Sequence, residues 1–229
     1  MMRFAGKRTL FVGAVAVMLA IGAGAAIAAV TLYSNDFSRR GDFEDILRSG
    51  GGKRCDKKYR EKSKVMLASI KASPTTCSFK TPVQGDDELP NYTISVEGKV
   101  LKNTPKSLRA GTFLEISARA GGGDTGYKLQ VFPQKKRFEL KREPQGNGFP
   151  KRGKSDAIKG INERNSLRLA VEGARVTAFV NGKEVAMVTD NNPGQVQGRK
   201  IRFAIGSQKE SRKDVVATFK RIAVSVPEP

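Results

Sequence analysis

The side chains with the clearest capacity for chemistry are basic, and they occur in four clusters. The first cluster, Lys53 to Lys64, holds seven basic residues against Asp56 and Glu61. The others are Lys135 to Arg142, Lys151 to Lys154 and Lys209 to Lys213. Clustered cations on a folded surface attract anionic ligands, although a solvated charged face has the same composition. The candidate ligand-binding residues are Lys57, Lys58, Tyr59, Arg60, Arg137 and Lys141.

Carboxylates that could perform acid–base chemistry occur singly. Glu97, Glu115 and Glu139 each lie in an alternating segment without a second acidic residue on the same side. Hydrolysis of a glycosidic bond usually requires two carboxyl groups in one cleft, and a Ser-His-Asp arrangement requires a histidine, which this chain lacks. We therefore expect these glutamates to be solvated, outward-facing residues. Whether the chain is an enzyme stays open, and the residues argue against it.

The two cysteines, Cys55 and Cys77, are predicted to form a disulfide. An even number of cysteines in an exported chain usually pairs, and closing a loop of this length stabilises a fold by about 3 kcal/mol on the chain-entropy model. Two thiols without histidine cannot complete a tetrahedral zinc shell. The cysteines therefore indicate an oxidising compartment.

The N-terminal residues indicate export. Arg3, Lys7 and Arg8 precede an uncharged run from Thr9 to Asn35. Residues 1–30 are therefore predicted to be either a cleavable signal peptide or a signal anchor that crosses the membrane as a single hydrophobic helix. In both cases residues 31–229 would be extracytoplasmic, either secreted or anchored in the cell membrane.

The net charge restricts the class of partner. The chain has a formal charge of +20, and without Arg3, Lys7 and Arg8 it keeps 39 basic residues against 22 acidic ones. A positive field of this size favours an anionic polysaccharide or another polymer of the cell envelope, whereas nucleic acid is an improbable partner for an exported domain without a nucleic-acid-binding motif.

The segments that must position these side chains read as short strands. Alternating apolar residues mark Thr112 to Ala120, Tyr127 to Phe132, Arg137 to Arg142 and Asn165 to Val171. Asn181-Gly182 predicts a tight hairpin turn, because Asn and Gly tolerate positive φ angles. About ten to twelve strands with frequent turn residues predict an all-β fold, an antiparallel sandwich in one domain covering residues 31–229.

The order of these segments resembles the concanavalin A-like lectin/glucanase superfamily, in its bacterial secreted branch of laminin G-like and keto-disaccharide hydrolase-like domains. The similarity rests on the LYSNDF strand, the GYKLQVF and RFELKR hairpin, LRLAVEGARVTAFVNGKEV, and the closing FAIG and ATFKRIAVSV strands. It implies a jelly roll of two antiparallel sheets and the binding of carbohydrate.

The resemblance also implies a structural Ca²⁺ near the first and last strands, held by an acidic pair. Asp36 matches the first position, but Lys220 follows Phe219 where the second carboxylate belongs. We therefore expect no metal and no cofactor. The predicted function is a non-catalytic extracytoplasmic module that binds an anionic glycan or envelope polymer. A glycoside hydrolase or lyase on the same fold, and a structural envelope protein without a small ligand, are the alternatives.

Overall fold

The computed structural model describes residues 29–50, 54–70, 75–84, 91–121, 125–196, 198–209 and 213–227. The predicted signal or anchor segment lies outside these residues, apart from its last two positions. Within the described ranges no helix is long and apolar enough to cross a membrane.

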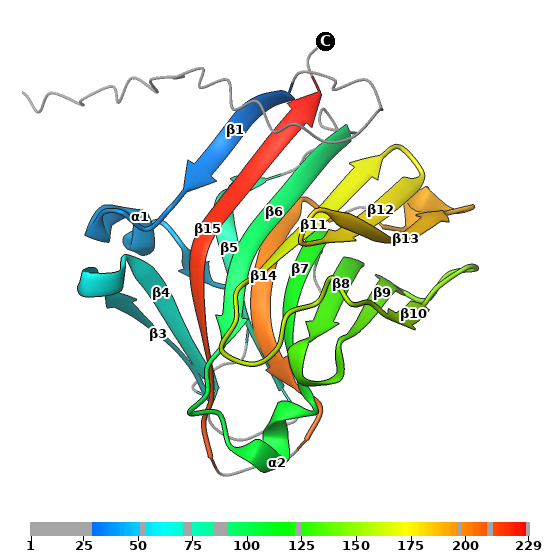
Figure 1. Cartoon of the computed structure of the whole chain (residues 1–229). Coiled ribbons are helices and arrows are strands. Elements are labelled where there is room, and N and C mark those ends of the chain that lie inside the picture. The colour runs from blue at the N-terminus through cyan, green and yellow to red at the C-terminus, as the bar shows by residue number, and fades with distance from the viewer. Residues whose placement is uncertain are drawn as a thin grey trace, which may run out of the picture.

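Two antiparallel sheets form a sandwich, as predicted (Figure 1). The first sheet has eight strands, seven of them in the order β13 (Lys183–Thr189), β12 (Arg175–Val180), β11 (Asn165–Glu172), β6 (Asn91–Val100), β15 (Val215–Pro227), β4 (Val65–Ile70) and β3 (Cys55–Arg60). The remaining strand, β1 (Ala29–Asn35), pairs with the C-terminal part of β15. The predicted Asn-Gly turn joins β12 and β13, and both residues have positive φ angles, 49° and 84°.

The second sheet has seven strands. Their order is β10 (Lys151–Lys154), β9 (Arg137–Glu143), β8 (Gly126–Phe132), β7 (Thr112–Ala120), β14 (Lys200–Ser207), β5 (Thr75–Gln84) and β2 (Leu47–Arg48). Helices are short: α1 (Arg40–Glu44), α2 (Lys106–Arg109) and the single 3₁₀ turns Glu61–Ser63, Pro133–Lys135 and Pro193–Gln195.

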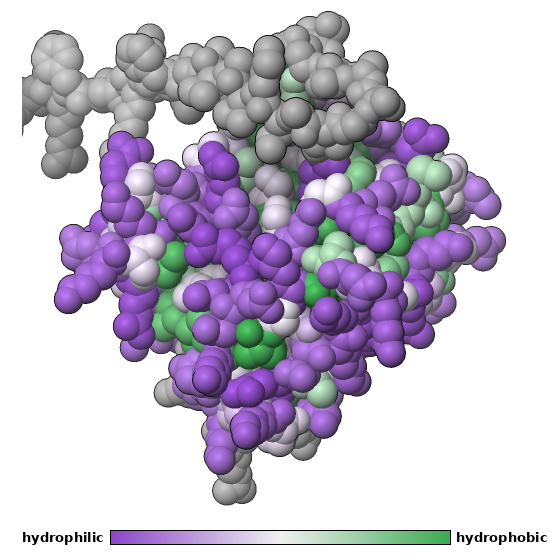
Figure 2. Space-filling model, viewed as in Figure 1, coloured by the Kyte–Doolittle hydropathy of each residue, from purple (hydrophilic) through white to green (hydrophobic). Residues whose placement is uncertain are grey.

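The core lies between the two sheets and is closed by large apolar side chains from both. Phe203 on β14 contacts Phe79 on β5 with ring centroids 5.4 Å apart, and Phe219 on β15 with centroids 4.8 Å apart. The Cys55–Cys77 disulfide, as predicted, joins β3 of one sheet to β5 of the other. This disulfide indicates an extracytoplasmic location. Figure 2 shows a largely hydrophilic surface on the viewed face, with apolar area confined to small patches.

Two of the basic clusters lie on edge strands of the sandwich. Residues of the first cluster form the edge strand β3, and Lys151–Lys154 is the edge strand β10. Basic residues suit edge strands, because charged side chains discourage the pairing of an exposed edge with another chain.

One buried tyrosine, Tyr92, and one partly buried tyrosine, Tyr33, make the stability of this fold sensitive to high pH. Burial raises the pKa of Tyr92, and that of Tyr33, from 10.0 to about 12. When folding raises the pKa of a phenol, its contribution to stability is fully present at a pH below the pKa of the unfolded state, which is 10.0. This contribution is lost as the pH rises from about 10 towards the folded-state pKa of about 12. In urea unfolding, we expect the contribution of these two tyrosines to the free energy of unfolding to be constant up to about pH 10 and to decrease above it. Replacement of Tyr92 by Phe should flatten the decrease, and an unchanged slope would contradict the assignment.

Candidate functional site

The side of the seven-stranded sheet that faces away from the core carries polar residues, and we call it the polar face. Leu114, Ile116 and Leu129 point into the core, so their sequence neighbours point outward. Strand pairing aligns these outward residues into three rows across the sheet. The middle row reads Ser78, Ala204, Glu115, Gln130, Glu139 and Arg152 from β5 to β10.

The two glutamates of the middle row are held by their neighbours. Gln130 Nε2 donates a hydrogen bond of 2.7 Å to Glu115 Oε2, and Ser117 Oγ donates one of 3.0 Å to Glu115 Oε1. Glu139 forms ion pairs with Arg152 and, at 3.3 Å, with Lys141 Nζ. Glu115 is 6% exposed and Glu139 2% exposed. The expectation that these glutamates are solvated was therefore wrong: they point outward but are buried, and each contacts side chains of its own row and the next.

A cationic row lies beside the middle row. It reads Lys80, Arg202, Ser117, Lys128 and Lys141 from β5 to β9. Four of its five members are cationic and none is acidic. Arg202 donates from Nη2 to the carbonyl of Gly121 at 2.8 Å, which orients its guanidinium. Ser117 divides the row into two cationic pairs, Lys80 with Arg202 and Lys128 with Lys141. In the second pair Lys128 is 5% exposed and Lys141 forms the ion pair with Glu139.

An aromatic row borders the other side of the middle row. The rings of Phe113 and Phe132 contact with centroids 5.3 Å apart, and the Arg137 guanidinium lies 4.0 Å above the Phe132 ring. Lys154 pairs with Arg137 across the strands. Phe113 occupies the space above Gly206, where a Cβ atom would meet the ring at 2.0 Å. The aromatic side chains thus support Arg137 at the edge of the polar face.

Some buried polar atoms on this face have no partner among the described residues. They are Gln130 Oε1, Arg137 Nε and Arg202 Nε. A buried polar group without a hydrogen bond is unfavourable, and native structures satisfy most such groups. These atoms are one acceptor and two donors, which matches the hydrogen-bonding groups of a polyhydroxylated or acidic ligand.

The six predicted ligand-binding residues do not form one site. Arg137 and Lys141 lie on the polar face. Lys57 and Tyr59 point from β3 toward the interior: Lys57 Nζ donates to the carbonyl of Phe43 at 3.0 Å and lies 4.2 Å from the Phe43 ring centroid, and Tyr59 donates to the carbonyl of Phe37 at 3.0 Å. Burial lowers the pKa of Lys57.

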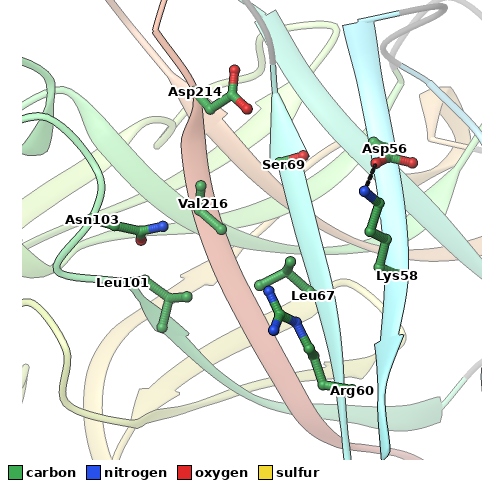
Figure 3. Close-up of a pocket in the computed structure, with 9 residues that line it drawn as sticks. All are labelled: Asp56, Lys58, Arg60, Leu67, Ser69, Leu101, Asn103, Asp214 and Val216. Carbon is green, nitrogen blue, oxygen red and sulfur yellow. Dashed lines mark ion pairs between the residues drawn. The ribbon is translucent and has the colours of Figure 1, made fainter.

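The remaining two predicted residues, Lys58 and Arg60, point outward from β3 on the other sheet. They line a pocket of about 310 Å³ on its outer side (Figure 3). Successive side chains of a strand point to opposite faces of the sheet, so Lys58 and Arg60 lie on the other face from Lys57 and Tyr59.

The position of the implied calcium site contains no cluster of metal ligands among the described residues. Asp36 Oδ1 accepts a hydrogen bond of 2.9 Å from the backbone N–H of Ser38, so this carboxylate caps a turn. Hydrogen bonding from Ser38 lowers the pKa of Asp36. Lys220 is exposed. These residues do not fit a calcium ion, which needs several oxygen ligands.

Several residues of the polar face were not identified from the sequence, namely Lys80, Lys128, Gln130, Arg152 and Arg202. Lys128 and Gln130 lie in a segment expected to be a strand, and Arg152 lies in one of the basic clusters. What the sequence did not supply was the pairing of non-neighbouring segments, which brings β14 between β5 and β7. The hairpin of β8 and β9 was expected, and it alone would have placed Gln130 beside Glu139.

Comparison with known structures agrees with the sandwich. A galectin-like protein of unknown function from Bacillus subtilis superposes with a TM-score of 0.59 at 13% identity, over 86% of this chain and 97% of that one. The carbohydrate-binding module CBM66 from Bacillus subtilis gives 0.54 at 12%, over 78% and 93%. A prokaryotic β-1,3-1,4-glucanase (lichenase) from a mouse hindgut metagenome gives 0.58 at 13%, over 86% and 99%.

Comparison with curated protein sequences finds no match. A family model does match, over residues 80–224, which include most of the polar face and the strands that carry it. Together with the concanavalin A-like sandwich, this match shows that the chain belongs to the family of 3-keto-α-glucoside-1,2-lyase-like domains.

Proposed function

We propose that this domain is a non-catalytic extracytoplasmic module that binds an anionic glycan across its polar face. The cationic row carries the proposal, because it brings two cationic pairs, Lys80 with Arg202 and Lys128 with Lys141, to one face without an acidic member. Uronate carboxylates are suitable partners for such a row, since charge-assisted hydrogen bonds are stronger than neutral ones. The hydroxyl groups of the same glycan would meet Gln130 Oε1 and the unpartnered guanidinium nitrogens.

The arrangement of the carboxylates supports binding rather than catalysis. Glu139 is bracketed by Lys141 and Arg152, and Glu115 accepts hydrogen bonds from Gln130 and Ser117 on its two oxygens. A general base must instead be within reach of the proton that it removes, whereas Glu115 is 6% exposed and Glu139 is 2% exposed. The structural neighbours include a carbohydrate-binding module, which is consistent with a binding role on this scaffold.

The proposal is tested by the binding of the full-length chain to polygalacturonate, with dextran as the neutral polymer. We expect salt-sensitive binding of polygalacturonate and little binding of dextran. Lys80→Gln and Arg202→Gln should each weaken polygalacturonate binding by about 10-fold, since each removes a charge-assisted hydrogen bond. Lys183→Gln, at the exposed start of β13, is the matched control and should leave binding unchanged. Equal affinity for dextran, or binding unaffected by salt, would refute the proposal.

A second candidate function is that of a lyase that eliminates across C1 and C2 of a 3-keto glucoside. It is favoured by the family and by one further observation. Glu115 and Glu139 lie in one row with Gln130 between them, so their Cα atoms are about 10 Å apart. In a 1,2-elimination from a 3-keto glucoside, a base takes the proton from C2, the electron pair forms the C1–C2 double bond, and the C1–O bond breaks. The departing oxygen then takes a proton. The two carboxylates would have to serve as base and acid.

Turnover of a 3-keto glucoside distinguishes the two candidates. The binding module should release no product from this substrate at any pH. If the native chain forms product and Glu115→Gln lowers the rate by about 100-fold or more, the lyase would replace the binding proposal. A decrease of this size is usual for loss of an acid–base group.

A further inference from the structure

A second recess lies on the opposite side of the sandwich, and we call it the outer pocket. It has a volume of about 310 Å³ and lies on the outer side of the eight-stranded sheet, over β3, β4 and β15 (Figure 3). Nine residues line it, all of them within the described ranges: Asp56, Lys58, Arg60, Leu67, Ser69, Leu101, Asn103, Asp214 and Val216. None of them belongs to the polar face.

The floor of the outer pocket is apolar. Leu67 on β4 and Val216 on β15 point away from the core, where alternation would ordinarily place polar residues, and Leu101 follows the end of β6. Figure 3 shows Leu67 and Val216 at the centre of the group, with polar side chains around them. An apolar floor with a few polar groups at the rim is the usual composition of a small-molecule site.

The rim contains one cation and one carboxylate that have no partner among the described residues. Lys58 Nζ forms an ion pair of 3.8 Å with Asp56, and this pair accounts for both charges. The Arg60 guanidinium and the Asp214 carboxylate make no such contact. Figure 3 shows Arg60 extending toward Leu67, while Asp214 lies at the far side of the floor. Asn103 and Ser69 add neutral donors and acceptors between them.

We propose that the outer pocket binds a single acidic sugar unit, such as a uronic acid. The planar Arg60 guanidinium takes the carboxylate, a geometry in which arginine forms two parallel hydrogen bonds. Asp214, Asn103 and Ser69 take hydroxyl groups, and the C–H face of the sugar ring lies on Leu67 and Val216. The volume lies at the lower end of the range for ligand pockets, which suits one monosaccharide rather than an oligosaccharide.

This site is separate from the polar face, because the two lie on opposite outer sides of a sandwich whose sheets pack about 10 Å apart. If the proposed function of the polar face holds, one domain would therefore carry two glycan sites that face away from each other. Such a domain would connect two glycan chains rather than bind one chain twice.

Isothermal titration calorimetry of the full-length chain with glucuronate tests the outer pocket. Glucose and acetate serve as the neutral sugar and the bare carboxylate. We expect glucuronate to bind more tightly than either, and Arg60→Gln to weaken glucuronate binding by about 10-fold or more. Lys62→Gln is the matched control, because Lys62 is an exposed cation on the next turn that does not line the pocket.

The outcomes separate this proposal from the proposed function. Arg202→Gln should leave glucuronate binding at the outer pocket unchanged, whatever it does to polygalacturonate binding. The inference is overturned if glucose binds as well as glucuronate, if Arg60→Gln behaves like Lys62→Gln, or if a zwitterion such as γ-aminobutyrate binds in place of the sugar acid. Arg60 is exposed, so its replacement should not affect folding, and thermal unfolding of the variant checks this.

Discussion

Replacement of Arg142 by methionine is expected to reduce the free energy of unfolding by about 3–5 kcal/mol, because it leaves a buried carboxylate without its cation. Arg142 and Asp190 are 3% and 2% exposed, and Arg142 Nε lies 2.7 Å from Asp190 Oδ2. Methionine fills a similar volume without charge, so the loss reports the uncompensated Asp190 rather than an empty space. We expect this effect to be among the largest of any single charge substitution in the described part of the chain.

The contacts around this ion pair explain why its loss should be costly. The Tyr127 hydroxyl donates to Asp190 Oδ2 at 2.7 Å, and the backbone N–H of Asn192 donates to Oδ1 at 2.9 Å. Arg142 Nη2 in turn donates to the carbonyl of Asn192 at 2.7 Å and to Gln195 Oε1 at 3.0 Å. Burial, and then the hydrogen bond to Asp190, raise the pKa of Tyr127. The network ties the segment after β13 to β8 and β9, on the core side of the seven-stranded sheet.

Chemical denaturation at neutral pH measures this loss, and Arg152→Met is the matched control. Arg152 also forms an ion pair with a buried glutamate, Glu139, but its side chain is 59% exposed. Glu139 keeps a second cation, Lys141 Nζ at 3.3 Å, when Arg152 is removed. The control should therefore lose about 1 kcal/mol or less. The double variant Arg142→Met with Asp190→Leu should lose less than the sum of the single variants, because no buried charge remains. Equal losses for Arg142→Met and Arg152→Met would contradict the argument.

The fold followed from the sequence because its signals are local. Alternation in Asn165–Glu172 and Arg175–Val180 reflects one buried face on each strand. The Asn181-Gly182 turn depends only on the positive φ angles of two adjacent residues. The Cys55–Cys77 pair required no choice between partners, since the chain has two cysteines. Where alternation was obscured by charge, as in Cys55–Arg60, the strand was missed because three of its six residues are basic.

The site could not be predicted in the same way, because it depends on contacts between distant segments. Glu115 and Glu139 are 24 positions apart and each stands alone in its strand. They share a row only because Gln130 lies opposite both, through the pairing of β7 with β8 and of β8 with β9. Glu139 contacts Lys141 and Arg152 from its own and a neighbouring strand. Glu115 contacts Gln130 across the strands, a pairing that the sequence does not provide. A basic cluster likewise does not reveal that alternate residues serve opposite faces, as Lys57 and Lys58 do.

Phe203 is the core residue whose truncation should have the greatest effect, since its ring connects both sheets. It is 1% exposed, and it lies in β14 between Arg202 and Ala204, which face outward. Its contact with Phe219 on β15 is edge-to-face, with an angle of 72° between the rings, and Phe79 covers its other side. Edge-to-face pairs add to the free energy gained from burial alone.

Phe203→Ala should therefore reduce the free energy of unfolding by about 3–5 kcal/mol, as is usual when a buried aromatic ring is removed and the cavity does not collapse. Phe203→Leu should lose clearly less, because it retains most of the apolar volume. Met187→Ala, on a side chain that is 48% exposed, is the control and should change stability little. Below its unfolding temperature the alanine variant should still bind polygalacturonate. Arg202 lies on the side of the sheet opposite Phe203, and the carbonyl of Gly121 holds its guanidinium. A loss near that of the Met187 control would show that the two sheets are held together without this ring.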